Sequence, residues 1–248
     1  MKPWGTLAWV VAVVVVLAAA LLIAMVSHEI PSALIEAIED NDVIASDKLI
    51  KQGLGHEVCR DHGDKSRWYL PIHAAAYNGR PEILNQLILA GESPDAKDSQ
   101  GRTPLMHVWD GCDMDRPSDY EDCVDVLVGA KADVEARDVH GNTVLNRSPY
   151  PAFMVEAILS HGADPNTQNN RGDTPLHESC TAVRLAPFYG SSCDGIPNLL
   201  IAGADLSVVN NDGLTAEQLA LREKRDDIVR VIKRFENLKR GQATLTPH

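Results

Sequence analysis

The sequence predicts an all-α solenoid, built from repeated units of one turn and two antiparallel helices, behind an apolar N-terminal segment. A motif of an Asx residue, a Gly three positions later and a Thr two positions after that recurs along the chain. A residue suited to end a helix stands twelve positions before each Thr. Residues 7–26 carry no charge. Such periodicity is typical of arrays in which each unit packs only on its neighbours.

Residues 7–26 are predicted to form a transmembrane helix, because a helix of this length spans about 30 Å, the thickness of a bilayer's apolar core. Residues 1–6 include Lys2 and would remain cytoplasmic as part of a signal anchor. The repeats would then face the periplasm or another extracytoplasmic space. A cleaved signal peptide is the alternative, although its apolar stretch is usually shorter.

The segment at 31–53 is predicted to be an N-terminal capping repeat, and the segment at 54–69 a long connector. The connector contains His56, Cys59 and His62 at even spacing. Nitrogen and sulfur atoms of these residue types bind zinc, so a metal- or redox-linked site is one interpretation. A plain polar loop is the other, because no fourth ligand is evident.

The repeated motif predicts where each unit begins and ends. Gly permits a positive φ at the tip of a tight turn, Thr suits the cap of the following helix and Pro suits its first turn. The Thr residues are Thr103, Thr143, Thr174 and Thr215, and residues 70–75 fit the same position 33 residues before Thr103. The helix-ending residues are Gly91, Lys131, Gly162 and Gly203. Lys131 departs from Gly at a cost of about 1 kcal/mol.

Three units depart from regular spacing. An insertion at 109–123 is rich in aspartate, but Pro117 and Ser118 disturb a calcium-loop pattern, so a solvated acidic loop is expected. The unit that starts at Thr143 is short and contains two prolines, so its first helix should be truncated. A segment at 186–193 separates the helices of the next unit.

The C-terminal part is predicted to close the array. Residues 214–238 have one apolar and one basic face, as expected of a capping repeat with a solvated outer side. Residues 239–248 are expected to form a flexible, frayed tail.

The motifs at 70–75 and 174–177, with Ala-Gly-Ala-Asp at 202–205 and Gly-Ala-Asp at 162–164, resemble the ankyrin repeat family. The resemblance covers residues 30–238 and implies about six repeats, including the caps. It also implies that His73 and His177 hydrogen-bond between neighbouring turns and have a structural role rather than a catalytic one.

The resemblance implies that a partner protein binds along the turns and first helices. The positions that it assigns to this surface are Tyr77, Asn78, Ser99, Gln100, Arg102, Trp109, Asp110, Val139, His140, Asn142, Asn170, Arg171 and Asp173. Tyr77 and Trp109 are the expected anchors, because aromatic side chains dominate interface energies. For Trp109 the alternative is packing beneath the insertion that follows it.

Cysteines stand near the edges of the two insertions. This placement predicts disulfides between Cys112 and Cys123 and between Cys180 and Cys193, although four cysteines allow three connectivities. Cys59 would then be the remaining thiol.

The expected function is therefore non-catalytic protein binding. The chain has no phosphate-binding glycine loop, no nucleophile elbow and no zinc-protease motif. Its net charge of −12 repels nucleic acid and either steers a basic partner or serves solubility alone. No cofactor is expected. Within this class the chain could be a scaffold or an immunity protein that neutralises a secreted enzyme toxin; the connector thiol and histidines leave open an envelope stress protein.

Overall fold

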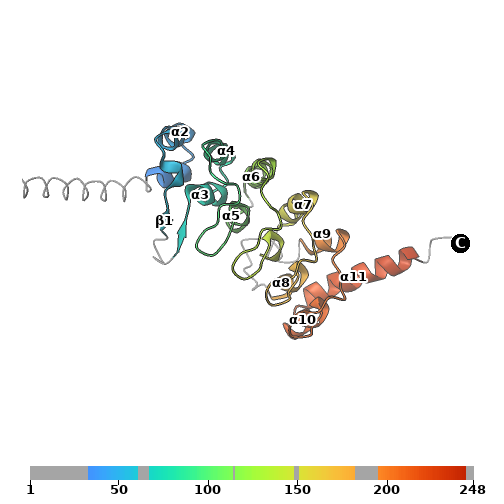
Figure 1. Cartoon of the computed structure of the whole chain (residues 1–248). Coiled ribbons are helices and arrows are strands. Elements are labelled where there is room, and N and C mark those ends of the chain that lie inside the picture. Colours follow the sequence, from blue (N-terminus) through green and yellow to red (C-terminus); the bar gives the residue numbers. More distant parts are fainter. Residues whose placement is uncertain (1–32, 61–66, 114, 148–150, 182–194, 244–248) are drawn as a thin grey trace, which may run out of the picture.

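The computed structural model describes residues 33–60, 67–113, 115–147, 151–181 and 195–243, and these form a curved array of helix pairs (Figure 1). Within these ranges no helix is both long enough and apolar enough to span a membrane. The predicted transmembrane segment at 7–26 and the N-terminus at 1–6 lie outside them.

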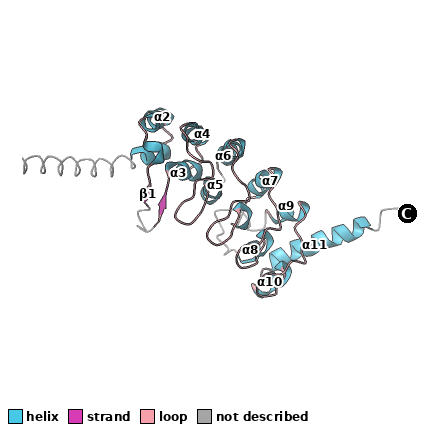
Figure 2. Ribbon diagram, viewed as in Figure 1, coloured by secondary structure: helices cyan, strands magenta, loops and turns pink. Residues whose placement is uncertain are grey.

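Each repeat contributes a first and a second helix, and the two kinds of helix form separate rows (Figures 1 and 2). The first helices are α3 (Pro71–Tyr77), α5 (Pro104–Gly111), η2 (Val144–Asn146), α8 (Pro175–Thr181) and α10 (Ala216–Arg222). The second helices are α4 (Pro81–Leu89), α6 (Pro117–Gly129), α7 (Ala152–Ser160), α9 (Ile196–Ile201) and α11 (Asp226–Ala243). A helix at residues 33–39 and α2 (Val43–Lys51) form the N-terminal cap.

The predicted helix-ending residues, and the predicted prolines at the start of α3 and α5, are confirmed. Proline occupies the first turn of α3, α4, α5 and α6, where its missing N–H leaves no bond unmade. The second residue after α4, α6, α7 and α9 takes a left-handed conformation, with φ of 104° at Gly91, 72° at Lys131, 89° at Gly162 and 98° at Gly203. The first helix of the unit that starts at Thr143 is a single 3-10 turn, η2, as the prolines and the shortened spacing of that unit predict.

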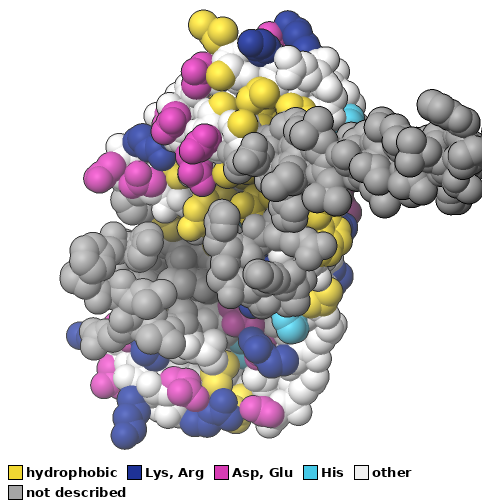
Figure 3. All heavy atoms as spheres, turned by 90° about the vertical axis from the view of Figure 1, so that its left-hand side faces the viewer, with side chains coloured by type: hydrophobic (Ala, Val, Ile, Leu, Met, Phe, Trp, Pro, Cys, Tyr) yellow, Lys and Arg dark blue, Asp and Glu magenta, His cyan; other side chains and the backbone are white. Residues whose placement is uncertain are grey.

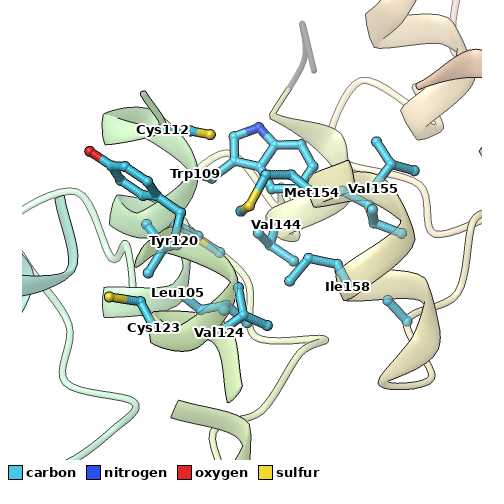
Figure 4. Packing of buried hydrophobic residues seen from close by; sticks show 14 of the residues in the cluster. Leu105, Trp109, Cys112, Tyr120, Cys123, Val124, Val144, Met154, Val155 and Ile158 are labelled. Atoms are coloured by element: carbon cyan, nitrogen blue, oxygen red, sulfur yellow. The ribbon is translucent and has the colours of Figure 1, made fainter. Parts of the chain in front are cut away.

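One continuous apolar core runs from Leu34 to Ile232 between the two rows of helices. Small residues such as Ala75 and Ala76 in α3 let this helix lie close to α5. The larger side chains of the second helices fill the space behind, as Figure 4 shows for the packing of Val124, Met154 and Ile158. The core is therefore built between neighbouring repeats rather than around one centre.

The expectation of an all-α chain needs one correction. The connector contains a short 3-10 helix, η1 (Leu54–His56), and two strands, β1 (Cys59–Arg60) and β2 (Trp68–Tyr69). The strands pair antiparallel, with Cys59 opposite Tyr69. They form because the connector must return to the row of turns before α3 begins, and a hairpin satisfies its backbone on the way.

Backbone hydrogen bonds join the tips of successive turns. The N–H of Ser99 donates to the Trp68 carbonyl at 3.0 Å, and that of Val139 donates to the Gln100 carbonyl at 3.1 Å. Asn170 bonds to His140, and Asn211 to Arg171, each at 3.0 Å. We call this series the tip ladder, and it fixes the position of each turn against the one before it.

Two further expectations are corrected in the second helices. α6 begins at Pro117, so the second half of the insertion predicted at 109–123 is helical rather than an acidic loop. α11 continues to Ala243, so residues 239–243 belong to a helix rather than to a frayed tail. The rest of that tail, 244–248, lies outside the described residues, as does the segment at 186–193.

Candidate functional site

The candidate site is the concave side of the array, lined by the turns and the first helices (Figure 1). Each turn begins with an Asx residue whose side chain accepts backbone N–H groups within its own turn. The Asp98 carboxylate accepts from the N–H of Gln100 at 2.8 Å and of Arg102 at 2.9 Å. Asp138, Asn169 and Asn210 accept in the same way. The turns therefore have a fixed shape that does not require a partner.

A second set of bonds ties three of the four turns to the first helix that follows each of them. The turn's opening residue bonds to a side chain nine positions later: Asp98 to His107 at 3.0 Å, Asp138 to Arg147 at 3.3 Å, and Asn169 to Glu178 at 2.7 Å. We call these contacts the nine-residue pairs. They place one polar side chain, from the first helix or from the residue that caps it, over each of these three turns, so together they form a polar row along the concave side.

A third set of bonds links this polar row from repeat to repeat. The Asp110 carboxylate accepts from the Arg147 guanidinium, with distances of 2.7 and 2.8 Å. The amide of Asn169 donates to Asn142 at 2.9 Å, and that of Asn210 donates to Asp173 at 2.8 Å. The charges of the row are therefore largely balanced by one another.

The electrostatics of the row follow from burial and these bonds. Burial opposes the charge of Asp98, but hydrogen bonds from His107 and Arg102 outweigh it and hold the pKa of this carboxyl well below its usual range. Burial lowers the pKa of His107, although its bond to Asp98 acts in the opposite direction. The ring of His73 lies 4.9 Å from that of His107. Burial first, and then the charge of His107, lower the pKa of His73 to about 4.

His73 and His177 have the structural role that the family resemblance implies. Nδ1 of His73 accepts from the N–H of Leu70 at 3.0 Å, while Nε2 donates to the carbonyl of Ala96 in the next turn at 2.9 Å. Nε2 of His177 donates to the Leu214 carbonyl at 3.0 Å in the same manner. Both rings are fully engaged within the array.

The predicted binding residues divide by exposure. Tyr77, Asp110, Val139, His140, Asn170 and Arg171 are exposed, with Tyr77 at 48% and Val139 at 56%. Asn78, Ser99, Gln100, Arg102 and Asn142 are partly buried. Asp173 is buried and accepts hydrogen bonds from Asn210 and Arg171, so it supports the surface rather than contributing to it.

The expectation that Trp109 is an anchor is wrong, because Trp109 is buried as its alternative required, although its printed hydrogen bond is to the next repeat rather than to the insertion that follows it. Trp109 is only 6% exposed and lies among buried hydrophobic side chains (Figure 4). Its indole N–H donates to the Arg147 carbonyl at 2.6 Å. It stands six residues after Thr103, as Ala76 stands six after Leu70, and Ala76 is completely buried. Asp110 is therefore the counterpart of Tyr77 in its repeat.

Sequence reasoning missed Arg147 and Glu178. Both are partly buried members of the nine-residue pairs. Arg147 also bonds to Asp110, and Glu178 to Arg171, and both of these partners had been predicted to bind the partner protein. The signal was present as complementary residue types nine positions apart, Asp with His, Asp with Arg and Asn with Glu. It becomes meaningful only when the turn is known to fold back over the first turn of its own helix.

The predicted disulfide between Cys112 and Cys123 is not formed, since both residues are separate buried thiols. Cys112 caps α5, while the early start of α6 places Cys123 inside that helix, on its buried face. Figure 4 shows their sulfur atoms pointing in different directions, with Tyr120 between them in this view. Burial raises the pKa of each thiol to about 12. Cys193, the expected partner of Cys180, lies outside the described residues.

The connector histidine and thiol are held by other contacts. Nδ1 of His56 lies against the buried Glu92 carboxylate, and the thiol of Cys59 is directed at the Glu57 carbonyl at 3.7 Å. Burial, with a smaller contribution from Glu57, raises the pKa of Cys59 to about 12. In the part of the chain that the structure describes, no group of three His, Cys, Asp or Glu residues is arranged to hold a metal ion. His62 lies outside that part.

The N-terminal end of the array presents a different character from the polar row. Figure 3 shows acidic side chains gathered along one flank of a hydrophobic strip on this face. Exposed apolar residues at this end include Ile44 and Trp68. The concave side remains the candidate site, because the predicted binding residues lie on its turns and first helices.

Comparisons with known proteins agree with this geometry. The family model for the ankyrin repeat matches residues 69–99. The potassium channel AKT2/3 of Arabidopsis thaliana is 30% identical over 160 residues, which are 64% of this chain and 18% of the channel. The B-cell lymphoma 3 protein homolog of Mus musculus is 26% identical over 196 residues, with 64% of this chain and 41% of that protein covered. The chain thus spans less than half the length of these two relatives.

A solved structure is also similar. It is that of the predatory endopeptidase Bd0816 from Bdellovibrio bacteriovorus in complex with the immunity protein Bd3460. One chain of that complex superposes with a TM-score of 0.60 at 25% identity, covering 82% of this chain and 97% of its own length.

Proposed function

The chain is an ankyrin-repeat protein, and we propose that it is a non-catalytic module that binds a partner protein through its concave side. The observation that carries this proposal is the contrast within the polar row. Most of its polar groups are satisfied internally, yet Tyr77 and Val139 stand exposed beside them. Large apolar side chains on a rigid polar surface are the usual anchors of a protein interface.

The test is capture of a partner by the full chain, followed by truncation of the anchors. Tyr77→Ala and Arg171→Ala should each reduce capture, because both side chains are exposed on the concave side. Leu89→Ala is the matched control, since Leu89 is 78% exposed on α4 in the other row of helices. If Tyr77→Ala and Arg171→Ala melt normally and keep every partner, the concave side is not the working surface.

A second candidate is that the partner is a secreted enzyme, which the chain neutralises as an immunity protein. This reading is favoured by the likeness to a chain from the endopeptidase–immunity protein complex. The purified chain, added to the secreted proteins of the cells that make it, should then lower cleavage of a fluorogenic casein. Tyr77→Ala should restore cleavage. If the unmodified chain does not change the cleavage of casein, the immunity function is contradicted and the scaffold function is favoured.

We also propose that residues 7–26 anchor the chain and display the repeats outside the cytoplasm. The support is the charge-free stretch of twenty residues, followed by Glu29, Glu36 and Glu39 rather than by basic residues. Protease added to spheroplasts should digest the repeats of the anchored chain. Protection until the cells are lysed would contradict the orientation, and a mature N-terminus near residue 28 would indicate a cleaved signal peptide.

A further inference from the structure

The last helix is longer than its place in the array requires. α11 has 18 residues, whereas α4 and α7, which occupy the same position in their repeats, have 9 each. Figure 1 shows α11 running past the end of the array toward the C-terminus. Its C-terminal half therefore has no neighbouring repeat among the described residues to pack against.

An apolar seam continues along this extension. Ile228, Val231, Phe235 and Leu238 follow one another at spacings of three, four and three residues, which places them on one stripe of the helix. Ile228 is fully buried, Val231 and Phe235 are half-buried, and Leu238 is 58% exposed. The seam thus begins in the core and emerges from it. Val229 and Ile232 widen the apolar face within the core, but from Lys233 to Arg240 only Phe235 and Leu238 are apolar. A stripe this narrow is typical of helix pairing, whereas helices that lie on membranes have a broad apolar face.

Two basic residues border the seam, Arg234 on one side and Lys239 on the other. Among the described residues neither makes an ion pair, although the ammonium of Lys239 lies 4.7 Å from the centre of the Phe235 ring. The basic residues farther round the helix are paired: Lys233 with Glu217 at 3.6 Å, and Arg240 with Glu236 at 3.9 Å. Arg230, nearer the start of the helix, donates to the backbone carbonyl of Asp226 at 3.1 Å. On the extension itself, the positive charges without a carboxylate are the two beside the apolar seam.

We propose that this seam docks an amphipathic helix of a partner protein, one that carries Asp or Glu on both sides of its own apolar stripe. Apolar packing would cover Phe235 and Leu238, while the partner's carboxylates would pair with Arg234 and Lys239. A second copy of this chain is a poor occupant. Parallel pairing of two α11 helices would set Arg234 of one against Lys239 of the other, and like charges at these positions repel. This interface is separate from the concave side.

The probes are two synthetic helical peptides with the same leucine seam, one with Glu and one with Lys at the flanking positions. The full chain should bind the Glu peptide at least about tenfold more tightly by fluorescence anisotropy. Leu238→Asn should weaken that binding without changing the melting temperature, because Leu238 is exposed. Equal binding of the two peptides, or binding of neither, would overturn the proposal.

Matched charge variants separate the seam from general attraction. Arg234→Gln with Lys239→Gln should weaken binding of the Glu peptide about tenfold, whereas Lys233→Gln with Arg240→Gln removes the same charge and should change it little. Arg234→Glu with Lys239→Glu should reverse the preference toward the Lys peptide. Equal loss in both Gln pairs, tighter binding to phosphatidylserine vesicles than to the Glu peptide, or a dimer that Leu238→Asn dissociates would each contradict the assignment.

Discussion

At the scale of single residues, the clearest departure from the repeat pattern is Lys131. Its φ of 72° is left-handed, the region taken by Gly91, Gly162 and Gly203 at the same place in their repeats. An L-residue with a Cβ is strained there, while Gly is not. The left-handed conformation of Lys131 therefore lowers stability, and nothing in the described structure explains why Lys stands there in place of Gly.

Lys131→Gly should therefore raise the free energy of unfolding by about 1 kcal/mol, measured by urea titration. Ala130→Gly is the control one residue earlier. Ala130 has a φ of −81°, so Gly there should lower stability by about 0.5 kcal/mol. Equal effects of the two substitutions would show that backbone strain is not the cause.

His73 should make stability depend on pH. Its pKa is lowered to about 4 in the folded chain, against about 6.5 when unfolded, so between these values the unfolded chain binds the proton more readily. The contribution is complete above pH 6.5 and is lost as pH falls toward 4, by up to about 3 kcal/mol. Comparison of urea midpoints at pH 7.5 and 4.5 measures it.

The control for His73 is already present in the chain. In the repeat that contains η2, Asn146 takes the place of His73. It accepts from the N–H of Thr143 at 3.1 Å and donates to the Thr167 carbonyl at 3.1 Å, and these are the two kinds of bond that His73 makes. His73→Asn should keep the fold and reduce the pH dependence. A variant with the full pH dependence would assign that dependence to other groups.

At the scale of elements, α3 and α5 come into close contact at the end of α5. A Cβ added at Gly111 would lie 1.8 Å from the carbonyl oxygen of Tyr77, and that oxygen also accepts from the Tyr120 hydroxyl at 3.3 Å. Backbone cannot yield as a flexible side chain can, so α3 and α5 pack in this way only because residue 111 has no side chain.

Gly111→Ala should therefore lower the free energy of unfolding by about 3 kcal/mol, since the two helices must separate. Gly129→Ala is the matched substitution at the end of α6, where nothing lies within 4 Å of an added Cβ. It should raise stability by up to about 1 kcal/mol. Thermal melts of both variants test the pair, and similar destabilisation of both would contradict the explanation.

Helix positions were predictable from the sequence because each depends on a local choice. Pro104 and Thr103 begin a helix, and a left-handed residue at 91 or 131 ends one, whatever lies around them. The burial of Trp109 was harder to predict, because tryptophan is common at protein interfaces, whereas its position in the repeat belongs to the buried core. The length of α11 was missed for a related reason: Leu238 continues the apolar pattern, but nothing local shows where the supporting repeats stop.

At the scale of the whole molecule, the interface between the repeat that contains α5 and the repeat that contains η2 is unusual. Met106 occupies the place of His73, and its side chain cannot donate the bond that joins neighbouring turns. Arg147 makes the connection instead. Its guanidinium bonds to Asp110 at the end of α5 and to Asp138 in its own repeat. Its backbone carbonyl accepts the hydrogen bond of the Trp109 indole N–H. Arg147 thus adds its side-chain bonds to the apolar core and to the Val139–Gln100 backbone bond, which also join the two halves of the array.

Arg147→Met should lower stability by about 2 kcal/mol, because it leaves the buried Asp138 carboxylate without its cation. It should also separate urea unfolding into two transitions, one for each half, since neighbouring contacts alone couple repeats. A double-mutant cycle with Asp110→Ala should give a coupling energy of about 1 kcal/mol. Additive effects with a single transition would show that the core alone joins the halves.

The tip ladder separates the length of the chain from the pitch of the array. The Thr residues that follow the turns are 40, 31 and 41 positions apart. Yet Val139, Asn170 and Asn211 each meet the preceding turn at 3.0–3.1 Å. Insertions between the two helices of a repeat lengthen the path without moving the next turn. Such a chain can acquire new loops while the spacing between successive turns stays the same. Binding of a partner that contacts several turns would then be unaffected.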